Sequence, residues 1–317
     1  MEDTLPQRLP AQIAVKRKPS VLREIAQHKY LYLLGLPGML CFIIFKYLPL
    51  PGIMIAFQDY SVYKGILQSE WVGLQHFITL FKDPDFFMLF RNTITISLLH
   101  ILMFPAPIVL ALLLNELKNA TVKRWIQTFV YVPHFVSWVI VISLTYIFLS
   151  KETGILNNLI HTWGGERIEL LFNGKAFYPL VILQEQWKNI GWGSIIYLAA
   201  IAGVDPALYE SAKMDGAGRL RQIWSVTLPS IIPTVIIMFI LALGHTLDTN
   251  FEQIYLMQNP INSEYSEVFE TYVYKQGIRE GEFSYTAAVG IFKSTIGLIL
   301  VLGSNYLVRR RGHEGIY

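Results

Sequence analysis

Apolar runs of about twenty residues recur along the sequence, and this feature constrains the fold more than any other. A helix of about 20 apolar residues crosses the hydrocarbon core of a bilayer, which is about 30 Å thick. Charged residues make up only 15% of the chain, whereas soluble domains carry roughly 25%. The sequence therefore predicts an all-α membrane protein with six transmembrane helices. The predicted spans are residues 30–54, 88–114, 125–149, 177–202, 229–247 and 285–308.

The distribution of Lys and Arg predicts the orientation of these spans, because basic residues near the ends of a span are retained in the cytoplasm. Segment 1–29 is rich in them and lacks an apolar core followed by a small-residue cleavage site, which predicts a retained cytoplasmic tail. Basic residues also concentrate in the loops after the second and fourth spans and after the sixth span. We therefore expect a membrane domain at 30–308, a second cytoplasmic tail at 309–317, and both termini in the cytoplasm.

The segments predicted on the outer side are long, at about 58–87, 150–176 and 249–284. Loops of this size usually have a function or contain short helices of their own. Within them, Leu74–Phe81 and Gly154–Trp163 have the pattern of short amphipathic helices that lie on the membrane surface.

The sequence offers little for other kinds of chemistry. The formal net charge is +3, which gives no reason to expect nucleic acid as a partner. Cys41 is the only cysteine, so neither an intramolecular disulfide nor a cysteine-rich metal cluster is expected. No G-x-x-x-x-G-K-[ST] loop occurs, and His100, His134 and His245 belong to no recognisable catalytic pattern. We expect no metal, no cofactor and no catalytic activity, so energy from ATP must come from a separate subunit.

The loop between the fourth and fifth spans has a distinctive pattern, YESAKMDGAGRLRQIWSVTLP at 209–229. A first helix is predicted up to Gly216, because glycine commonly ends helices in the left-handed conformation. Arg219 to Val226 can form a second helix, and Pro229 is predicted at the start of the helix that enters the membrane. The pattern thus predicts a helix, a glycine turn and a second helix on the cytoplasmic side.

This pattern resembles the EAA signature of permease subunits of bacterial binding-protein-dependent ABC importers. The signature is Glu-Ala-Ala, a glycine and then Ile-x-Leu-Pro, and here Ser211 replaces the first alanine and Val226 the isoleucine. The resemblance implies that the loop at 205–228 forms a coupling helix that docks into a groove of a cytoplasmic ATPase subunit. The alternative is an amphipathic helix that only lies at the membrane interface. The residues that the resemblance assigns to coupling are Glu210, Ser211, Ala212, Asp215, Gly216, Ala217, Leu228 and Pro229.

Three further stretches are similar to permeases of this family that import oligosaccharides and polysaccharide fragments, a group related to the maltose permeases. They are FKYLPLPGIMIAFQDY at 45–60, RNTITISLL at 91–99 and YVPHFVSWVI at 131–140. Within this group, the resemblance points to permeases of alginate-oligosaccharide importers. It implies a type I (MetI-like) importer core in the bacterial inner membrane, surrounded by lipid. It also implies a second homologous permease in a heterodimer, two ATPase subunits, a periplasmic or lipid-anchored solute-binding protein, and a saccharide substrate.

Polar residues inside the predicted spans mark a candidate substrate path, because each polar group in hydrocarbon is costly and needs a reason. Planar polar side chains suit sugar hydroxyls, and aromatic faces suit the apolar faces of sugar rings. An equally weighted alternative is that Glu185 and Lys188 pair with each other along one helix face. His245 and Lys293 are expected to make ordinary bonds between helices. The candidate substrate-path residues, chosen by composition and by position relative to the coupling loop in maltose-type permeases, are Glu185, Lys188, Asn189, Trp192, Thr246 and Asn250.

Prolines and one lysine inside the apolar runs predict local distortions of the spans. Pro105 and Pro107 argue for a kink in the second span. Lys46, followed by Pro49 and Pro51, marks the place where the first helix ends or bends and the lysine reaches toward the outer surface.

Two other classes of membrane protein are weighed against this interpretation. A secondary transporter or a channel would be expected to have internal repeats or ion sites within the membrane, and no repeat is visible in the sequence. An integral-membrane enzyme would need a catalytic pair within one span or on facing spans. The leading hypothesis is a transport subunit that alternates between inward-open and outward-open states.

Overall fold

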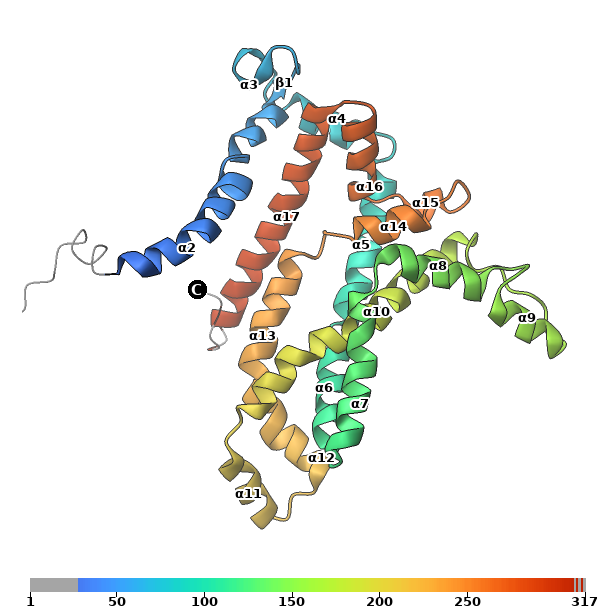
Figure 1. Ribbon diagram of the computed structural model, residues 1–317. Helices are drawn as coiled ribbons and strands as arrows, with labels where there is room; N and C mark the ends of the chain where they lie inside the picture. The colour runs from blue at the N-terminus through green and yellow to red at the C-terminus, as the bar shows by residue number, and fades with distance from the viewer. Residues whose placement is uncertain (1–27, 311, 313–314, 316–317) are drawn as a thin grey trace, which may run out of the picture. The chain divides into compact units, whose positions relative to one another are not determined.

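The computed structural model describes residues 28–310, 312 and 315, and these residues are almost entirely helical (Figure 1). Of the predicted tail 1–29, only positions 28 and 29 belong to the described residues. A single antiparallel pair of short strands, β1 and β2, occurs among them. In chain order the elements are α2 (Lys29–Phe42), η1 (Ile43–Tyr47), η2 (Leu50–Phe57), β1 (Gln58–Asp59), α3 (Gly65–Gln68), β2 (Glu70–Trp71), α4 (Gln75–Lys82), α5 (Phe86–Met103), α6 (Ala106–Glu116), α7 (Ala120–Tyr131), η3 (Val132–Phe135), α8 (Trp138–Leu149), α9 (Ile155–Thr162), α10 (Gly174–Ala202), α11 (Pro206–Met214), α12 (Arg219–Gln222), η4 (Ile223–Thr227), α13 (Leu228–Gly244), α14 (Phe251–Met257), α15 (Ser263–Ser266), α16 (Phe269–Val273), η5 (Tyr274–Arg279) and α17 (Phe283–Arg310).

Among the described residues, four helical segments are long and apolar enough to cross a membrane, and the number rises to six if each of two bent helix pairs is one span. The prediction of an all-α membrane protein is therefore confirmed. The four segments are Lys29–Phe57, Phe86–Glu116, Arg219–Gly244 and Phe283–Arg310, and the bent pairs are Ala120–Phe135 with Trp138–Leu149 and Gly174–Ala202 with Pro206–Met214.

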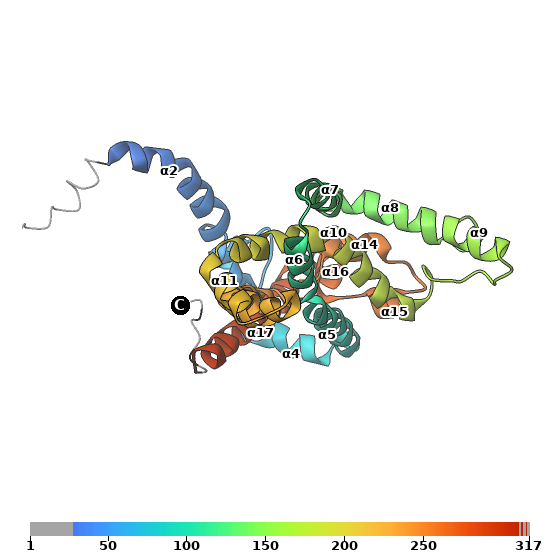
Figure 2. The same ribbon diagram turned by 90° about the horizontal axis from the view of Figure 1, so that it is seen from below.

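The third predicted span, 125–149, is not one continuous helix. The chain bends by 104° between the helical segment that ends at Phe135 and α8. After the bend, Ile142 of α8 packs into the cluster around Phe177, and α9 projects away from the other helices of the second unit (Figures 1 and 2). Pro133 lacks an N–H group and cannot continue the hydrogen bonds of an α-helix. Ser137 then begins a new helix, since its side chain caps the N-terminus of α8. Hydropathy alone does not detect this break, because the residues on both sides of it are apolar.

The predicted distortion of the second span coincides with an interruption of the α-helix at Pro105. α5 ends at Met103, and α6 begins at Ala106, directly after the proline. The proline lies at the start of the second helix, where its missing N–H leaves no helical hydrogen bond unmade.

The sequence predicted that Pro229 begins the helix that enters the membrane. In the structure, Pro229 lies within a longer helical segment. That helix already begins at Arg219, passes through the π-helical turn η4 and continues as α13. In a regular α-helix the ring of a proline collides with the carbonyl group four residues earlier. The wider π turn lies directly before the proline and lets the helix continue through it.

The chain divides into two units, residues 1–53 and 54–317. In the first unit, no residue of α2 or η1 is buried. In the second unit, buried hydrophobic side chains form separate clusters around Phe177, Phe269 and Tyr197. The long helix α10 contributes side chains to the first and third of these clusters, so it is the central packing element of this unit.

Both short helices predicted in the outer segments are confirmed. α4 covers the predicted stretch 74–81, and α9 covers most of the predicted stretch 154–163. Within the second unit, α4 lies at the opposite end from α11, the helix that follows α10 (Figure 1). The outer segments and the loop with the EAA-like pattern therefore lie far apart, as their assignment to opposite sides of a membrane requires.

Two helix crossings leave almost no space between backbones. A Cβ atom at Gly191 of α10 would lie 2.0 Å from the carbonyl oxygen of Val130 in α7. A Cβ atom at Gly297 of α17 would lie 2.9 Å from the carbonyl oxygen of Gly244 in α13. Small residues allow membrane helices to approach this closely, and dispersion contacts then hold them together.

The substitution Gly191→Ala should force α10 and α7 apart. Overpacking of this kind costs about 1–3 kcal/mol, so the melting temperature of the purified protein in detergent should fall by several degrees. Gly290→Ala is the matched control, because a Cβ atom there would meet nothing within 4 Å. Equal melting temperatures for the two variants would contradict the close crossing.

Asp83 ties the end of α4 to α16 and α17. Its Oδ2 atom accepts hydrogen bonds from the hydroxyl groups of Tyr272 and Tyr285, and its Oδ1 atom accepts one from the N–H of Asp85. Burial raises the pKa of Asp83, but these three hydrogen bonds outweigh burial and hold the pKa below its ordinary value of 3.8. Burial, followed by the bond to Asp83, raises the pKa of the Tyr272 hydroxyl, which therefore stays a donor.

Because the pKa of Asp83 is lower in the folded protein, its carboxylate stabilises the fold above the ordinary pKa of 3.8 and loses this effect as the pH falls through the lowered value. Asp83→Asn should destabilise the protein at pH 7 by about 1–3 kcal/mol. The difference from the unsubstituted protein should shrink as thermal unfolding is measured at successively lower pH below the ordinary pKa. Asp59→Asn, at an exposed carboxylate, should change little at any pH. A difference that does not depend on pH would contradict the role of the Asp83 charge.

Candidate functional site

A cavity of about 520 Å³ lies among α5, α6, α10 and α13. Most of its wall is apolar, from residues such as Phe104, Ile190 and Phe239. Side chains that lie one turn apart on a helix share a face, and this places Glu185 and Asn189 of α10 together in the cavity. The polar residues that line it are His100, Glu185, Gln186, Asn189, Tyr197, His245, Thr246 and Asp248.

Two features of this cavity make it receptive to polar groups. The carboxylate of Glu185 in α10 contacts Nε2 of His100 in α5, which holds a carboxylate and an imidazole at the wall. The Oε1 atom of Gln186 is buried and accepts no hydrogen bond from the described residues. A buried polar atom without a partner costs free energy, so this oxygen is available to water or to a polar ligand.

A second group of charges lies where α13 ends. Asp248 lies 3.1 Å from Nδ1 of His245 through one carboxylate oxygen and 3.3 Å from Nζ of Lys293 through the other. Lys293 of α17 also pairs with Glu270 of α16. Lys293 therefore makes the bonds between elements that the sequence led us to expect, whereas His245 pairs three residues along its own chain segment. Asp248 and His245 line the cavity, so this network connects the cavity to α17.

Three of the six candidate substrate-path residues, Glu185, Asn189 and Thr246, line the cavity. They come from α10 and from the end of α13, which the sequence could not show to be neighbours. The Thr246 hydroxyl donates to the carbonyl oxygen of Ala242 at 3.1 Å and keeps its own oxygen as an acceptor.

The other three candidates lie outside the cavity lining. Trp192 stacks flat on His134, with ring centroids 4.5 Å apart and planes inclined by 2°. Asn250 caps α14, because its side chain accepts a hydrogen bond from the N–H of Gln253. Lys188 donates to backbone carbonyl groups at the break between α7 and α8.

The pairing of Glu185 with Lys188, the alternative considered from the sequence, is not formed. Glu185 pairs with His100 instead, and the Lys188 ammonium bonds to carbonyl oxygens. The two side chains leave different faces of α10, since one enters the cavity and the other faces the break. Spacing along one helix therefore did not decide the partner of either residue.

The sequence analysis missed His100, Gln186 and Asp248 as lining residues. His100 was set aside among scattered histidines, although a histidine within an apolar run is costly and needs a polar neighbour. That neighbour, Glu185, lies on another span. A search of the sequence could pair each ionisable residue of one predicted span with the ionisable residues of the other spans. Such a search would have included His100 with Glu185, among several other possible pairs.

The loop with the EAA-like pattern begins with the short helix α11. The side chain of Asp205 accepts a hydrogen bond from the N–H of Ala207 at 2.9 Å, and Pro206 occupies the first position of the helix. Both residues favour the start of a helix, the first by satisfying a free N–H and the second by having none. α11 therefore has a sharply defined start.

The end of α11 is equally well defined. Gly216 has a φ of +75°, the left-handed conformation that glycine adopts without strain. Its N–H donates to the carbonyl of Lys213 at 3.0 Å, and the N–H of Ala217 donates to the carbonyl of Ala212 at 2.9 Å. This pair of bonds is the Schellman motif. The predicted helix, glycine turn and second helix are thus confirmed as structure.

α11 is attached to two helices of the cavity. It follows α10 after a bend of 72°, and the Tyr209 hydroxyl lies 3.0 Å from the Thr227 hydroxyl, at the end of the turn that leads into α13. None of the residues of α11 is buried, and Met214 is 88% exposed. The helix therefore presents an open, partly apolar surface while remaining connected to both α10 and α13.

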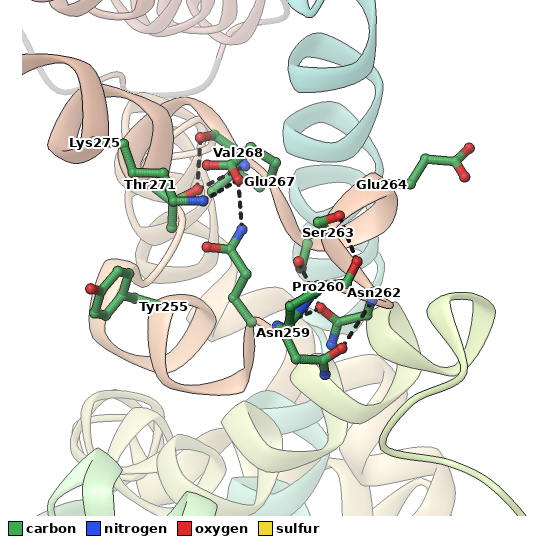
Figure 3. Close-up of polar contacts among 12 residues, drawn as sticks. Tyr255, Asn259, Pro260, Asn262, Ser263, Glu264, Glu267, Val268, Thr271 and Lys275 are labelled. Atoms are coloured by element: carbon green, nitrogen blue, oxygen red, sulfur yellow. Dashed lines mark hydrogen bonds and ion pairs between the residues drawn. The ribbon is translucent and has the colours of Figure 1, made fainter. Parts of the chain in front are cut away.

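A further polar cluster lies in the outer segment and is drawn in Figure 3. Glu267 pairs with Lys275 and accepts a hydrogen bond from the Gln258 side chain at 2.8 Å. Glu264 extends away from Glu267 (Figure 3). Within the described residues, no group of three or more His, Cys, Asp and Glu residues is arranged to hold a metal ion. The contacts of this cluster join α14 to η5 and stiffen the outer segment.

Comparisons with known proteins identify the family. The family described as "Binding-protein-dependent transport system inner membrane component" matches residues 103–313. The polygalacturonan/rhamnogalacturonan transport system permease protein YteP of Bacillus subtilis (strain 168) is 52% identical over 95% of this chain and 94% of its own. Protein LplB of the same organism is 49% identical over 99% of this chain and 100% of its own.

Solved structures agree with these matches. A chain in the crystal structure of a bacterial alginate ABC transporter, in complex with an alginate pentasaccharide-bound periplasmic protein, is 38% identical and superposes with a TM-score of 0.85. That alignment covers 94% of this chain and 100% of the other. The resemblance to permeases of saccharide ABC importers, noted from the EAA-like loop and three further stretches, is confirmed. This chain belongs to the family of inner membrane components of binding-protein-dependent transport systems.

Proposed function

We propose that this chain forms half of the translocation pathway for an oligosaccharide or polysaccharide fragment, and that the cavity beside α10 is its part of the path. The observation that carries the proposal is one cavity that combines Glu185, Asn189 and the unpartnered oxygen of Gln186 with an apolar wall. Carboxylate and amide groups bond to sugar hydroxyls, and apolar walls fit the faces of sugar rings. The names of the relatives support a saccharide, since one is a permease of a polygalacturonan/rhamnogalacturonan transport system.

Other subunits complete this function. A second, homologous permease supplies the other half of the path in a heterodimer and closes the open side of the cavity. A periplasmic or lipid-anchored binding protein delivers the saccharide, as the alginate-bound periplasmic protein in the related crystal structure suggests. Two separate ATPase subunits hydrolyse ATP, and this chain is non-catalytic.

The loop at 205–228 is the element through which the ATPase subunits act. A helix transmits force to its neighbours when it is rigid and firmly attached, and α11 is capped at both ends. It is joined to α10 by a short link and to the start of α13 by the Tyr209–Thr227 contact. Because α10 and α13 both line the cavity, a displacement of α11 would alter the cavity directly. Glu210 and Asp215 can pair with basic groups of the ATPase subunit.

The same interpretation fixes the orientation in the membrane. α11 and both termini of the chain face the cytoplasm. α4, α9 and the Glu267 cluster face the periplasm. The excess of Lys and Arg in the cytoplasmic segments supports this orientation. The alternative, a secondary transporter or channel, gives no role to a capped and exposed helix between two cavity-lining helices.

The substitution Gly216→Leu tests the coupling role. A left-handed conformation costs a residue with a side chain about 1–2 kcal/mol, so the end of α11 should fray and saccharide-stimulated ATP hydrolysis by the assembled transporter should fall about tenfold. Gly216→Asn is the matched control, because asparagine tolerates this conformation, and it should keep most of the activity. Membrane insertion should be normal in both. Unchanged hydrolysis in Gly216→Leu would refute the docking role.

The substitution Asn189→Ala tests the substrate path. Loss of one hydrogen-bonding amide should raise the KM for transport by about tenfold, while ATP hydrolysis without substrate stays unchanged. Glu185→Gln should alter the preference between neutral and anionic saccharides, because it removes a negative charge from the wall. Leu183→Ala, on another face of α10, is the control. A defect confined to ATP coupling would remove Asn189 and Glu185 from the path.

A further inference from the structure

Lys188 has an environment that neither sugar binding nor ATPase coupling explains. The residue lies on the long helix α10 and is only 8% exposed. Its ammonium group donates to the carbonyl oxygens of Pro133, His134 and Val136, with the distance to His134 being 2.7 Å. The ammonium also lies 5.5 Å from the centre of the Trp138 ring. The three carbonyl groups belong to the break between α7 and α8, and Trp138 is the first residue of α8.

The break creates a need that an ammonium group meets. Where a helix stops inside a membrane, its last carbonyl groups lose their partners, and water is absent to replace them. Those carbonyls also form the negative end of the helix dipole. An ammonium group has three donors and a positive charge, so one Lys188 bonds to the carbonyl oxygens of His134 and Val136 and adds a contact to that of Pro133, which also accepts from the N–H of Val136. Within the described part of the chain, Lys188 takes part in no ion pair with a carboxylate.

The same break is in contact with the cavity. The Nδ1 atom of His134 lies 3.0 Å from Oδ1 of Asn189, and because that oxygen can only accept, Nδ1 donates. The His134 ring is held flat against Trp192. Asn189 is thus oriented by a residue of the break, while its amide nitrogen is left for the cavity. The position of the break therefore determines how Asn189 is presented.

We propose that Lys188 is a positioning residue, which holds the third span in its bent form and thereby orients Asn189 through His134. Lys188 itself makes no contact with the saccharide. The first part of this proposal concerns the bend alone. The second part rests on the function proposed above, in which Asn189 lines the substrate path. The two parts have separate measurements, so failure of one can be distinguished from failure of the other.

The bend can be measured by spin labels on either side of it. Val122 of α7 and Ile147 of α8 are 44% and 54% exposed, and both can be replaced by cysteine in a Cys41→Ala background that removes the only native cysteine. The protein is purified with its partner subunits and reconstituted in lipid. In the protein that retains Lys188, electron–electron double resonance should give one narrow distribution of the distance between the two spin labels. Lys188→Met should shift or broaden that distance, and Lys188→Arg, which retains the charge and the donors, should restore it.

Lys175→Met is the matched control, because this exposed lysine lies on the same helix and far from the break in sequence. It should leave the distance unchanged. If Lys188→Met does not accumulate in the membrane, Lys188→Gln retains two donors without the charge and should give a broadened distance. An unchanged distance in either variant overturns the proposal.

Transport kinetics then separate positioning from substrate binding. Lys188→Met should lower the maximal rate of transport by about tenfold or more, since a buried charged hydrogen-bonding group is lost, with rescue by Lys188→Arg. Its KM should also rise, in the direction of the Asn189→Ala variant, because Asn189 loses its orientation although Lys188 itself does not touch the substrate. A raised KM with an unchanged spin-label distance would make Lys188 a substrate ligand and refute the positioning role. A changed spin-label distance with normal transport would support the role of Lys188 in the bend. It would refute the proposal that Lys188 orients Asn189.

Discussion

Backbone polar groups that lie within a membrane must find their partners inside the protein, and this constraint organises the whole second unit of the chain. Regular helices satisfy it by themselves, but this chain contains a broken third span and irregular outer segments. Buried polar side chains supply the missing bonds. Asn92 donates to the carbonyls of Glu264 and Glu267 at 2.9 and 2.8 Å. Lys188 does the same at the break. Asn92 and Lys188, both within apolar segments, therefore serve the backbone.

The helix α10 joins these supports to the candidate site. Its faces carry different residues to different places, since Glu185 and Asn189 enter the cavity while Lys188 and Trp192 contact the break. Gly191 allows α7 to approach it backbone to backbone. At its end, α10 leads within a few residues into the capped helix α11. A rotation of α10 would therefore change the cavity, the break and the position of α11 together, which is the kind of linked rearrangement that the proposed alternation between inward-open and outward-open states requires.

Local chemistry decided what the sequence could predict. The end of α11 could be predicted because Gly216 acts on the residues directly beside it. Pro105 marked the interruption of the second span for the same reason. The break at Pro133 was missed because hydropathy stays high across it. The partners of Glu185 and Lys188 depended on which helices pack together, and the interaction of His100 with Glu185 joins two spans far apart in the sequence. These contacts needed the tertiary structure.

In the proposed substrate path, the arrangement of charge suits passage of a ligand more than its retention. The carboxylates of Glu185 and Asp248 each have an imidazole partner, His100 and His245. These contacts hold each carboxylate beside an imidazole when the cavity is empty, so an arriving hydroxyl group competes with that partner and gains little net free energy. A transport path needs binding that is favourable enough for entry and weak enough for release. For the proposed path, a mostly apolar wall with a few such pairs and the unpartnered oxygen of Gln186 fits both conditions.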